Sequence, residues 1–203
     1  MNTKVLHNLT CGLYVLASKN GAHRSGCIIN TVMQVTSKPL RITVTVNKAN
    51  YTHDLIASSG VFTVSLLDQS APFGLFQHFG FQSGRDVDKF KDLSVKEAEN
   101  GVPYLTWASC GYLSCKVVSS MDLGTHTQFL ADVIDAEALD GTAPVSYAYY
   151  QAHIKPKPQP KEDAPVKGWV CTICGYIYEG ETLPEDFICP LCKHGVEAFE
   201  KIQ

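Results

Sequence analysis

Several features that mark other classes of protein are scarce or missing in this 203-residue sequence. Basic residues are in no excess, because 17 Lys and Arg stand against 20 Asp and Glu, for a formal net charge of −3. The charge therefore gives no indication of nucleic-acid binding. The apolar run near the N-terminus is too short to span a bilayer, and no signal-peptide cleavage pattern follows it. We expect a cytoplasmic protein that binds neither nucleic acid nor membrane.

A dinucleotide-binding fingerprint is also missing, since no G-x-G-x-x-G opens a helix after the first predicted strand. Runs rich in Val, Ile, Thr and aromatic residues instead predict β-strands. Two short segments that end on glycine predict helices. Many strands with short helices favour a mainly β fold built on an antiparallel barrel. The predicted strands cover 9–18, 25–36, 40–47, 61–67, 104–123 and 126–139, and the helices 51–60 and 71–80.

The chain divides at one stretch rich in proline and lysine. Residues 153–166 contain four prolines and few apolar side chains, a composition that favours an extended backbone. We therefore predict a barrel domain at 1–152, a linker at 153–166 and a small domain at 167–203. Fully extended, the linker would span roughly 43 Å. A tether of this length keeps the small domain at an effective concentration on the order of millimolar and lets it swing toward a partner.

The eight cysteines form two groups. Four are scattered among apolar residues, and we interpret them as buried, reduced structural cysteines: Cys11, Cys27, Cys110 and Cys115. The other four form two Cys-x-x-Cys pairs separated by fourteen residues: Cys171, Cys174, Cys189 and Cys192. Four thiolates at this spacing predict one tetrahedral metal ion, and both zinc and a single iron suit them.

The small domain needs such an ion because so short a chain buries little apolar surface. Its aromatic residues predict a small core of Trp169, Tyr176, Tyr178, Phe187 and Phe199. Residues 167–203 carry three basic and six acidic side chains. That acidic balance argues against a zinc ribbon that binds nucleic acid.

The segments "WVCTICGYIYEG", "LPEDFICPLC" and "FEKI" closely resemble rubredoxin, a one-iron electron carrier. The resemblance implies a mononuclear iron held by the four cysteines. The alternative is a zinc ribbon that only stabilises the fold. Two departures stand out: the gap between the cysteine pairs is shorter than in free-standing rubredoxins, and Lys193 replaces a usual glycine. The second bears on the reduction potential, because hydrogen bonds to sulfur tune it.

The N-terminal stretches "SGCIINTVMQVTSKPLRITVTVNKANYTHDLIASSGVFTVSLL" and "GTHTQFLADVIDAE" resemble the flavin reductase-like, FMN-binding split-barrel family. The resemblance implies that the flavin ring and ribityl chain contact Asn30, Thr31, Gln34, Val35 and Thr36. It implies that the FMN phosphate lies near Asn47, Lys48, Thr52, Ser83, Gly84, Arg85 and Lys89. It also implies a catalytic His126 in the nicotinamide pocket, although Thr125 stands where an acidic residue often precedes that histidine.

Each of these assignments has a structural alternative. Asn47 and Asn50 could cap the helix that begins at Tyr51. His126 could be a histidine at a strand end that faces water. The charged residues after Gly84 could form a solvated turn: Arg85, Asp86, Asp88 and Lys89.

Together the two resemblances imply an NAD(P)H-dependent reductase of anaerobic bacteria. Its electrons would pass from NAD(P)H through FMN to the iron, and on to a flavodiiron protein that reduces nitric oxide or dioxygen. They also imply a homodimer with FMN near the subunit interface. The alternative is a flavin reductase that supplies free reduced flavin, with the metal domain serving as a docking element or a structural zinc site.

Overall fold

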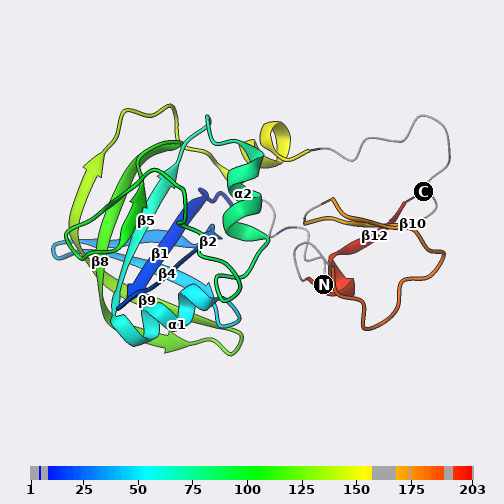
Figure 1. Ribbon diagram of the computed structural model, residues 1–203, viewed down its shortest axis with the longest axis horizontal. Helices are drawn as coiled ribbons and strands as arrows, with labels where there is room; N and C mark the ends of the chain where they lie inside the picture. Colours follow the sequence, from blue (N-terminus) through cyan, green and yellow to red (C-terminus); the bar gives the residue numbers. More distant parts are fainter. Residues whose placement is uncertain (1–4, 6–8, 157–167, 174, 190–193, 203) are drawn as a thin grey trace.

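The computed structural model of the chain describes residues 5, 9–156, 168–173, 175–189 and 194–202 (Figure 1). The larger domain is built around one antiparallel sheet of seven strands, in the order β2-β1-β5-β8-β9-β4-β3. The strands are β1 (Tyr14–Asn20), β2 (His23–Ile29), β3 (Val32–Ser37), β4 (Leu40–Asn47), β5 (Val61–Leu67), β8 (Ser109–Asp122) and β9 (His126–Ala138).

The two edge strands of this sheet, β2 and β3, are consecutive in the chain and only Asn30 and Thr31 join them. The sheet therefore curls until its edges meet at this corner, which produces a split barrel. The Thr31 hydroxyl fastens the corner by donating to the Thr45 carbonyl oxygen of β4 at 2.7 Å. The predicted mainly β fold is confirmed.

Two apolar clusters make up the core of the larger domain. One lies inside the curled sheet and includes the fully buried Val44, Phe62 and Val64. The other lies between the sheet and helix α2 (Phe73–Gly80) and includes Phe76 and Phe79. The second cluster explains why α2 is so rich in phenylalanine, since one side of this helix is buried against β2.

Helix α1 (Tyr51–Ser59) begins after Asn50 and ends at Gly60, which adopts a left-handed conformation with φ of 72°. This is the glycine ending that the sequence predicted. Asn50 occupies the N-cap position without a capping side-chain hydrogen bond. Asn47 Oδ1 instead accepts from the Ala49 amide at 2.9 Å and shapes the turn into the helix.

Several predicted boundaries are wrong. The strand predicted at 25–36 is two strands, because the chain turns the barrel corner at Asn30 and Thr31. The strand predicted at 104–123 is β7 (Pro103–Leu105) and β8, divided by Ala108 with φ of 53°. The sequence also did not predict β6 (Val95–Glu97), α3 (Tyr147–Tyr149) or the helical turn η2 (Tyr150–Ile154), which runs past residue 152.

The small domain has a three-stranded sheet in the order β11-β10-β12. Its elements are β10 (Gly168–Cys171), β11 (Ile177–Tyr178), η3 (Val196–Ala198) and β12 (Phe199–Ile202). All five aromatic residues predicted for its core pack together around Cys171 and Cys189. In Figure 1 this domain lies on the α2 side of the barrel.

None of the helices in the described part of the chain has the length and apolarity that a membrane span requires.

Candidate functional site

The larger domain contains a cavity of about 710 Å³ between β2, the start of α1 and the segment that follows α2. This size lies within the usual range for a site that binds one cofactor. Hydroxyl, amide and thiol groups from separate parts of the chain meet in its wall. Five of the residues predicted to bind FMN line it: Asn47, Thr52, Ser83, Gly84 and Lys89.

A close approach of two backbone segments shapes this cavity. A Cβ atom placed on Gly84 would lie 2.0 Å from Ser25 Oγ, so the chain needs glycine here. Ser25 Oγ in turn accepts a hydrogen bond from Thr52 Oγ1 at 3.2 Å, and both side chains are buried. The contact joins β2, α1 and the segment after α2 at one point. Sequence reasoning missed Ser25, although small residues in a strand, here Ser25 and Gly26, can signal such an approach.

Lys89 is 3% exposed, and its ammonium group is held by two backbone carbonyls. Nζ donates to Gly26 O at 2.9 Å and to Phe79 O at 2.8 Å. Burial lowers the pKa of Lys89, and burial also raises the pKa of the neighbouring Cys27 thiol to about 11. Lys89, predicted to lie near the FMN phosphate, thus lies in the cavity wall, where its ammonium ties β2 to the end of α2.

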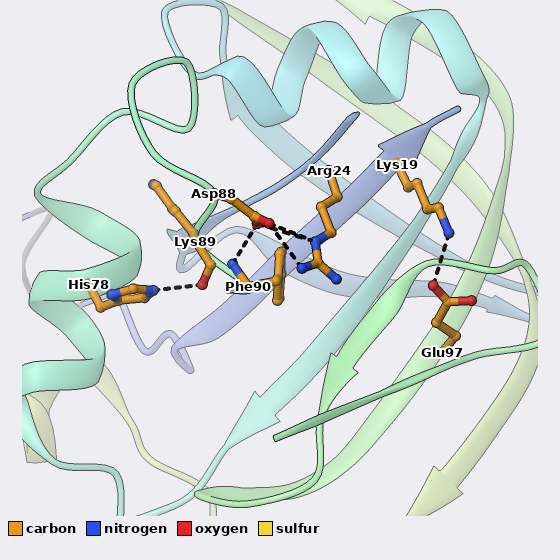
Figure 2. A network of polar contacts seen from close by, with 7 residues as sticks. All are labelled: Lys19, Arg24, His78, Asp88, Lys89, Phe90 and Glu97. Carbon is orange, nitrogen blue, oxygen red and sulfur yellow. Dashed lines mark hydrogen bonds and ion pairs between the residues drawn. The ribbon is translucent and has the colours of Figure 1, made fainter. Parts of the chain in front are cut away.

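Hydrogen bonds hold the segment after α2 in place (Figure 2). Arg24 Nη2 donates to Asp88 Oδ2 at 2.9 Å, and Arg24 Nε lies 3.2 Å from Asp88 Oδ1. Asp88 Oδ1 also accepts from the Phe90 amide at 2.9 Å, while His78 Nε2 donates to Lys89 O at 2.6 Å. The hydrogen bond from Arg24 is the main cause that lowers the pKa of Asp88. These contacts fix the backbone on both sides of Lys89.

The charged residues after Gly84 form a turn that is exposed to solvent except at Lys89, so the alternative of a solvated turn holds for part of it. Arg85 is exposed and donates to the Asp54 carboxylate and to Ala49 O, so its guanidinium is already paired in this structure. Asp86 and Asp88 are exposed too. Lys89 is the exception because it is buried.

The remaining predicted residues do not line the cavity. Gln34, Val35 and Thr36 are exposed on β3, and Asn30 and Thr31 form the barrel corner. Lys48 Nζ donates to Asp122 Oδ1 at 2.7 Å, and this hydrogen bond lowers the pKa of Asp122. His126 begins β9 as the strand partner of Asn47, which places it beside the cavity wall. Its Nδ1 lies 2.8 Å from Thr125 Oγ1.

The predicted metal centre is described in part, because Cys174, Cys192 and Lys193 lie outside the described residues. Cys171 and Cys189 are both fully buried, as expected for thiolates that hold a metal. The Gly175 amide donates to Cys171 O at 2.8 Å, and Gly175 itself has a φ of 80°. The two described cysteines thus fit the metal site that the sequence predicts.

Sequence reasoning missed the part that the small domain takes in the cavity wall. His194, Gly195 and Glu197 line the same cavity as Ser83 and Gly84. The Cys189 amide donates to His194 O at 2.8 Å, so this wall is bonded to one of the predicted metal ligands. Nothing in the local sequence signals this contact, since it depends on how the two domains pack.

The four scattered cysteines form no disulfide in the described part of the chain. Cys27 and Cys115 are buried, and Cys11 and Cys110 are half-buried. Burial raises the pKa of Cys115 to about 12. This agrees with the prediction of reduced structural cysteines, with two of them less buried than expected.

Comparison with known proteins places the whole chain. Residues 6–157 match the family model of the flavin reductase like domain, and residues 169–200 match that of the rubrerythrin, rubredoxin-like domain. The chain belongs to the flavin reductase-like family and carries a rubredoxin-like domain at its C-terminal end. It is 38% identical over 229 residues to the high molecular weight rubredoxin of Moorella thermoacetica, with 100% of both chains covered. The predicted combination of domains is therefore confirmed.

Two further comparisons concern the barrel. Over 157 residues the chain is 36% identical to the ferric-chelate reductase (NAD(P)H) of Archaeoglobus fulgidus, covering 77% of this chain and 93% of that protein. The crystal structure of flavoredoxin from Methanosarcina acetivorans has a TM-score of 0.59 and 24% identity, covering 64% of this chain and 70% of that one. At this identity the likeness concerns the fold.

Proposed function

We propose that the protein transfers electrons from NAD(P)H, through FMN in the barrel, to an iron centre in the small domain and on to a one-electron acceptor. The observation that carries the proposal is the cavity of about 710 Å³ that both domains line, with Gly84 from the larger domain and His194 from the small one. The family of the larger domain implies a flavin, and that of the smaller implies a metal held by cysteines.

The residues of the cavity fit FMN. Its volume of about 710 Å³ suits one such ligand. Gly84 contributes its backbone, and the half-buried Ser83 a hydroxyl, to the same part of the cavity wall. Asn47 and Thr52 offer an amide from the end of β4 and a hydroxyl from the start of α1. The chain's own task is to bind and orient the flavin and to exclude water, for which the fixed segment around Lys89 is suited.

Cys171 and Cys189 would hold the iron, together with Cys174 and Cys192 of the sequence pattern. When bound, FMN takes up two electrons together and releases them singly, whereas iron in a four-thiolate site exchanges one. The name of the Archaeoglobus relative supports NAD(P)H as the donor. We assign His126 to the nicotinamide side, since it pairs with cavity residue Asn47.

For the acceptor we propose a flavodiiron protein or another one-electron partner, and we propose that the protein acts in the cytoplasm as a homodimer. Exposed apolar side chains on neighbouring strands support the second copy: Met33 and Val35 of β3, Leu40 of β4, Ile134 of β9, and Val118 and Met121 of β8. The molar mass in solution tests the homodimer, and a monomer at micromolar concentration would contradict it.

A visible spectrum with metal and flavin analysis tests the proposal against its alternative. A ferric four-thiolate centre is red, whereas zinc is colourless. We expect one iron and one tightly bound FMN per chain after purification. Zinc in place of iron, with flavin that is lost on gel filtration, would favour the flavin reductase that supplies free reduced flavin.

A further inference from the structure

The small domain contacts the cavity through one short turn. His194, Gly195 and Glu197 line it, and the turn has a defined shape. Glu197 Oε1 accepts from the Gly195 amide at 3.1 Å, and the Ala198 amide donates to Gly195 O at 3.1 Å. The turn is therefore structured before any ligand is bound, and contact with the barrel requires little further ordering.

A second contact joins the two domains next to Cys171. Lys155 Nζ, directly after η2, donates to Thr172 O, the carbonyl next to Cys171. A smaller cavity of about 200 Å³ lies at this contact, between Gln151 on the barrel side and Val170 of β10. Cys171 is thus adjacent to Thr172, which binds Lys155 of the larger domain. Cys189 is hydrogen-bonded to His194, which lines the larger cavity.

We propose that these two contacts form an interaction surface on which the metal domain closes over the flavin cavity of its own chain. In the closed arrangement the His194 turn covers the cavity beside Ser83 and Gly84, and Lys155 binds the Thr172 carbonyl next to Cys171. The linker keeps the domain at an effective concentration on the order of millimolar, so weak contacts suffice and the domain can also leave. The role of this surface in electron transfer rests on the proposed function. The closed arrangement itself is inferred from the two contacts alone.

Magnetic resonance of the full-length protein, with flavin bound, tests the closed arrangement. The chain is prepared with ferric iron and, as a diamagnetic reference, with zinc. Because line broadening by iron falls steeply with distance, we expect the amide signals of Gly80 and Gly84 to broaden in the iron form. In the double variant His194→Ala/Lys155→Met the broadening falls at least about threefold, since it is weighted by the population of the closed arrangement.

Lys116→Met is the matched control, because Lys116 is exposed on β8. It should leave the broadening unchanged. Iron content and the visible spectrum show whether the double variant still holds its metal. If the two substitutions together disturb folding, Lys155→Met alone serves as the test and should give a smaller reduction of the broadening. Equal signals in the iron and zinc forms of the wild type would overturn the proposal. Broadening without electron transfer from the flavin to the iron would support the interaction surface and refute the proposed function. Electron transfer without broadening would support the proposed function and refute the interaction surface.

Discussion

The ammonium nitrogen of Lys89 lies 2.8 Å from the carbonyl oxygen of Phe79, in the wall of the cavity between β2, α1 and the segment after α2. Phe79 is in the last turn of α2, where carbonyl groups have no partner within the helix. A cation at this end also complements the helix dipole. The second carbonyl, Gly26 O, belongs to β2, so one buried charge joins helix and sheet beside this cavity.

We expect Lys89→Met to destabilise the protein by about 2 kcal/mol and to weaken FMN binding, because two buried carbonyls lose their hydrogen bonds. Urea denaturation of the flavin-free protein and a fluorescence titration with FMN measure the two effects. Lys116→Met, at an exposed lysine, should change neither by more than about 0.5 kcal/mol. Equal behaviour of the two variants would contradict the structural role of the buried ammonium.

A pair of glycine substitutions tests the close approach at the cavity. Gly84→Ala places a methyl group against Ser25 Oγ, so either the segment moves or the serine leaves Thr52. We expect FMN affinity to fall about tenfold, or about 1.4 kcal/mol. Gly74→Ala is the control, since a Cβ there meets nothing within 4 Å and α2 should gain about 0.5 kcal/mol. Calorimetric titration with FMN is the measurement. Unchanged affinity in Gly84→Ala would show that the flavin does not use this backbone.

The buried thiols predict a loss of stability in alkali. The pKa of Cys115 is raised to about 12 in the folded protein, whereas the unfolded thiol ionises near pH 8.5. The contribution of the protonated Cys115 thiol to the free energy of unfolding is therefore complete below about pH 8.5. It declines as the pH rises toward 12, because the unfolded thiol loses its proton first. At pH 10 this loss is roughly 2 kcal/mol.

Urea denaturation at pH 7 and pH 10 measures that loss. Cys115→Ala should show a smaller decline between the two pH values than the wild type does. The same loss in both proteins would mean that other groups cause it.

In addition, iodoacetamide should modify Cys27 and Cys115 only after unfolding, because the thiolate is the reactive form.

Removal of one predicted metal ligand should unfold the small domain alone. In Cys189→Ser we expect loss of the iron and of the fixed environment of Trp169, with the barrel and its flavin retained, since the small core depends on the metal. Iron analysis and tryptophan fluorescence provide the readout. Cys110→Ser, at a half-buried cysteine of the barrel, is the control and should keep its iron. Iron retained in Cys189→Ser would refute the assignment of this ligand.

Regular patterns made much of the fold predictable. Alternation in β4 and β5, the glycine that ends α1 and the aromatic residues of the small domain each act over a few neighbouring residues. The breaks were harder to predict. The corner at Asn30 and Thr31 contains neither Gly nor Pro, and Ala108 adopts a positive φ that its residue type does not signal.

The site was predictable only where a residue type is specific to its task. Ser83 and Gly84, which the family resemblance placed near the FMN phosphate, do line the cavity. The burial of Lys89 was not predictable, because its two carbonyl partners come from Gly26 and Phe79, the first of them 63 residues away in the chain. The contact of His194 likewise depends on the packing of two domains.

Anaerobic stopped-flow absorbance of the full-length protein, with NAD(P)H as donor, tests the central claim most directly. The account predicts that the flavin absorbance falls first, that the red colour of the iron centre bleaches after it, and that protein stripped of flavin keeps its red colour. Bleaching at the same rate without flavin, or a red centre that persists while the flavin is fully reduced, would contradict it.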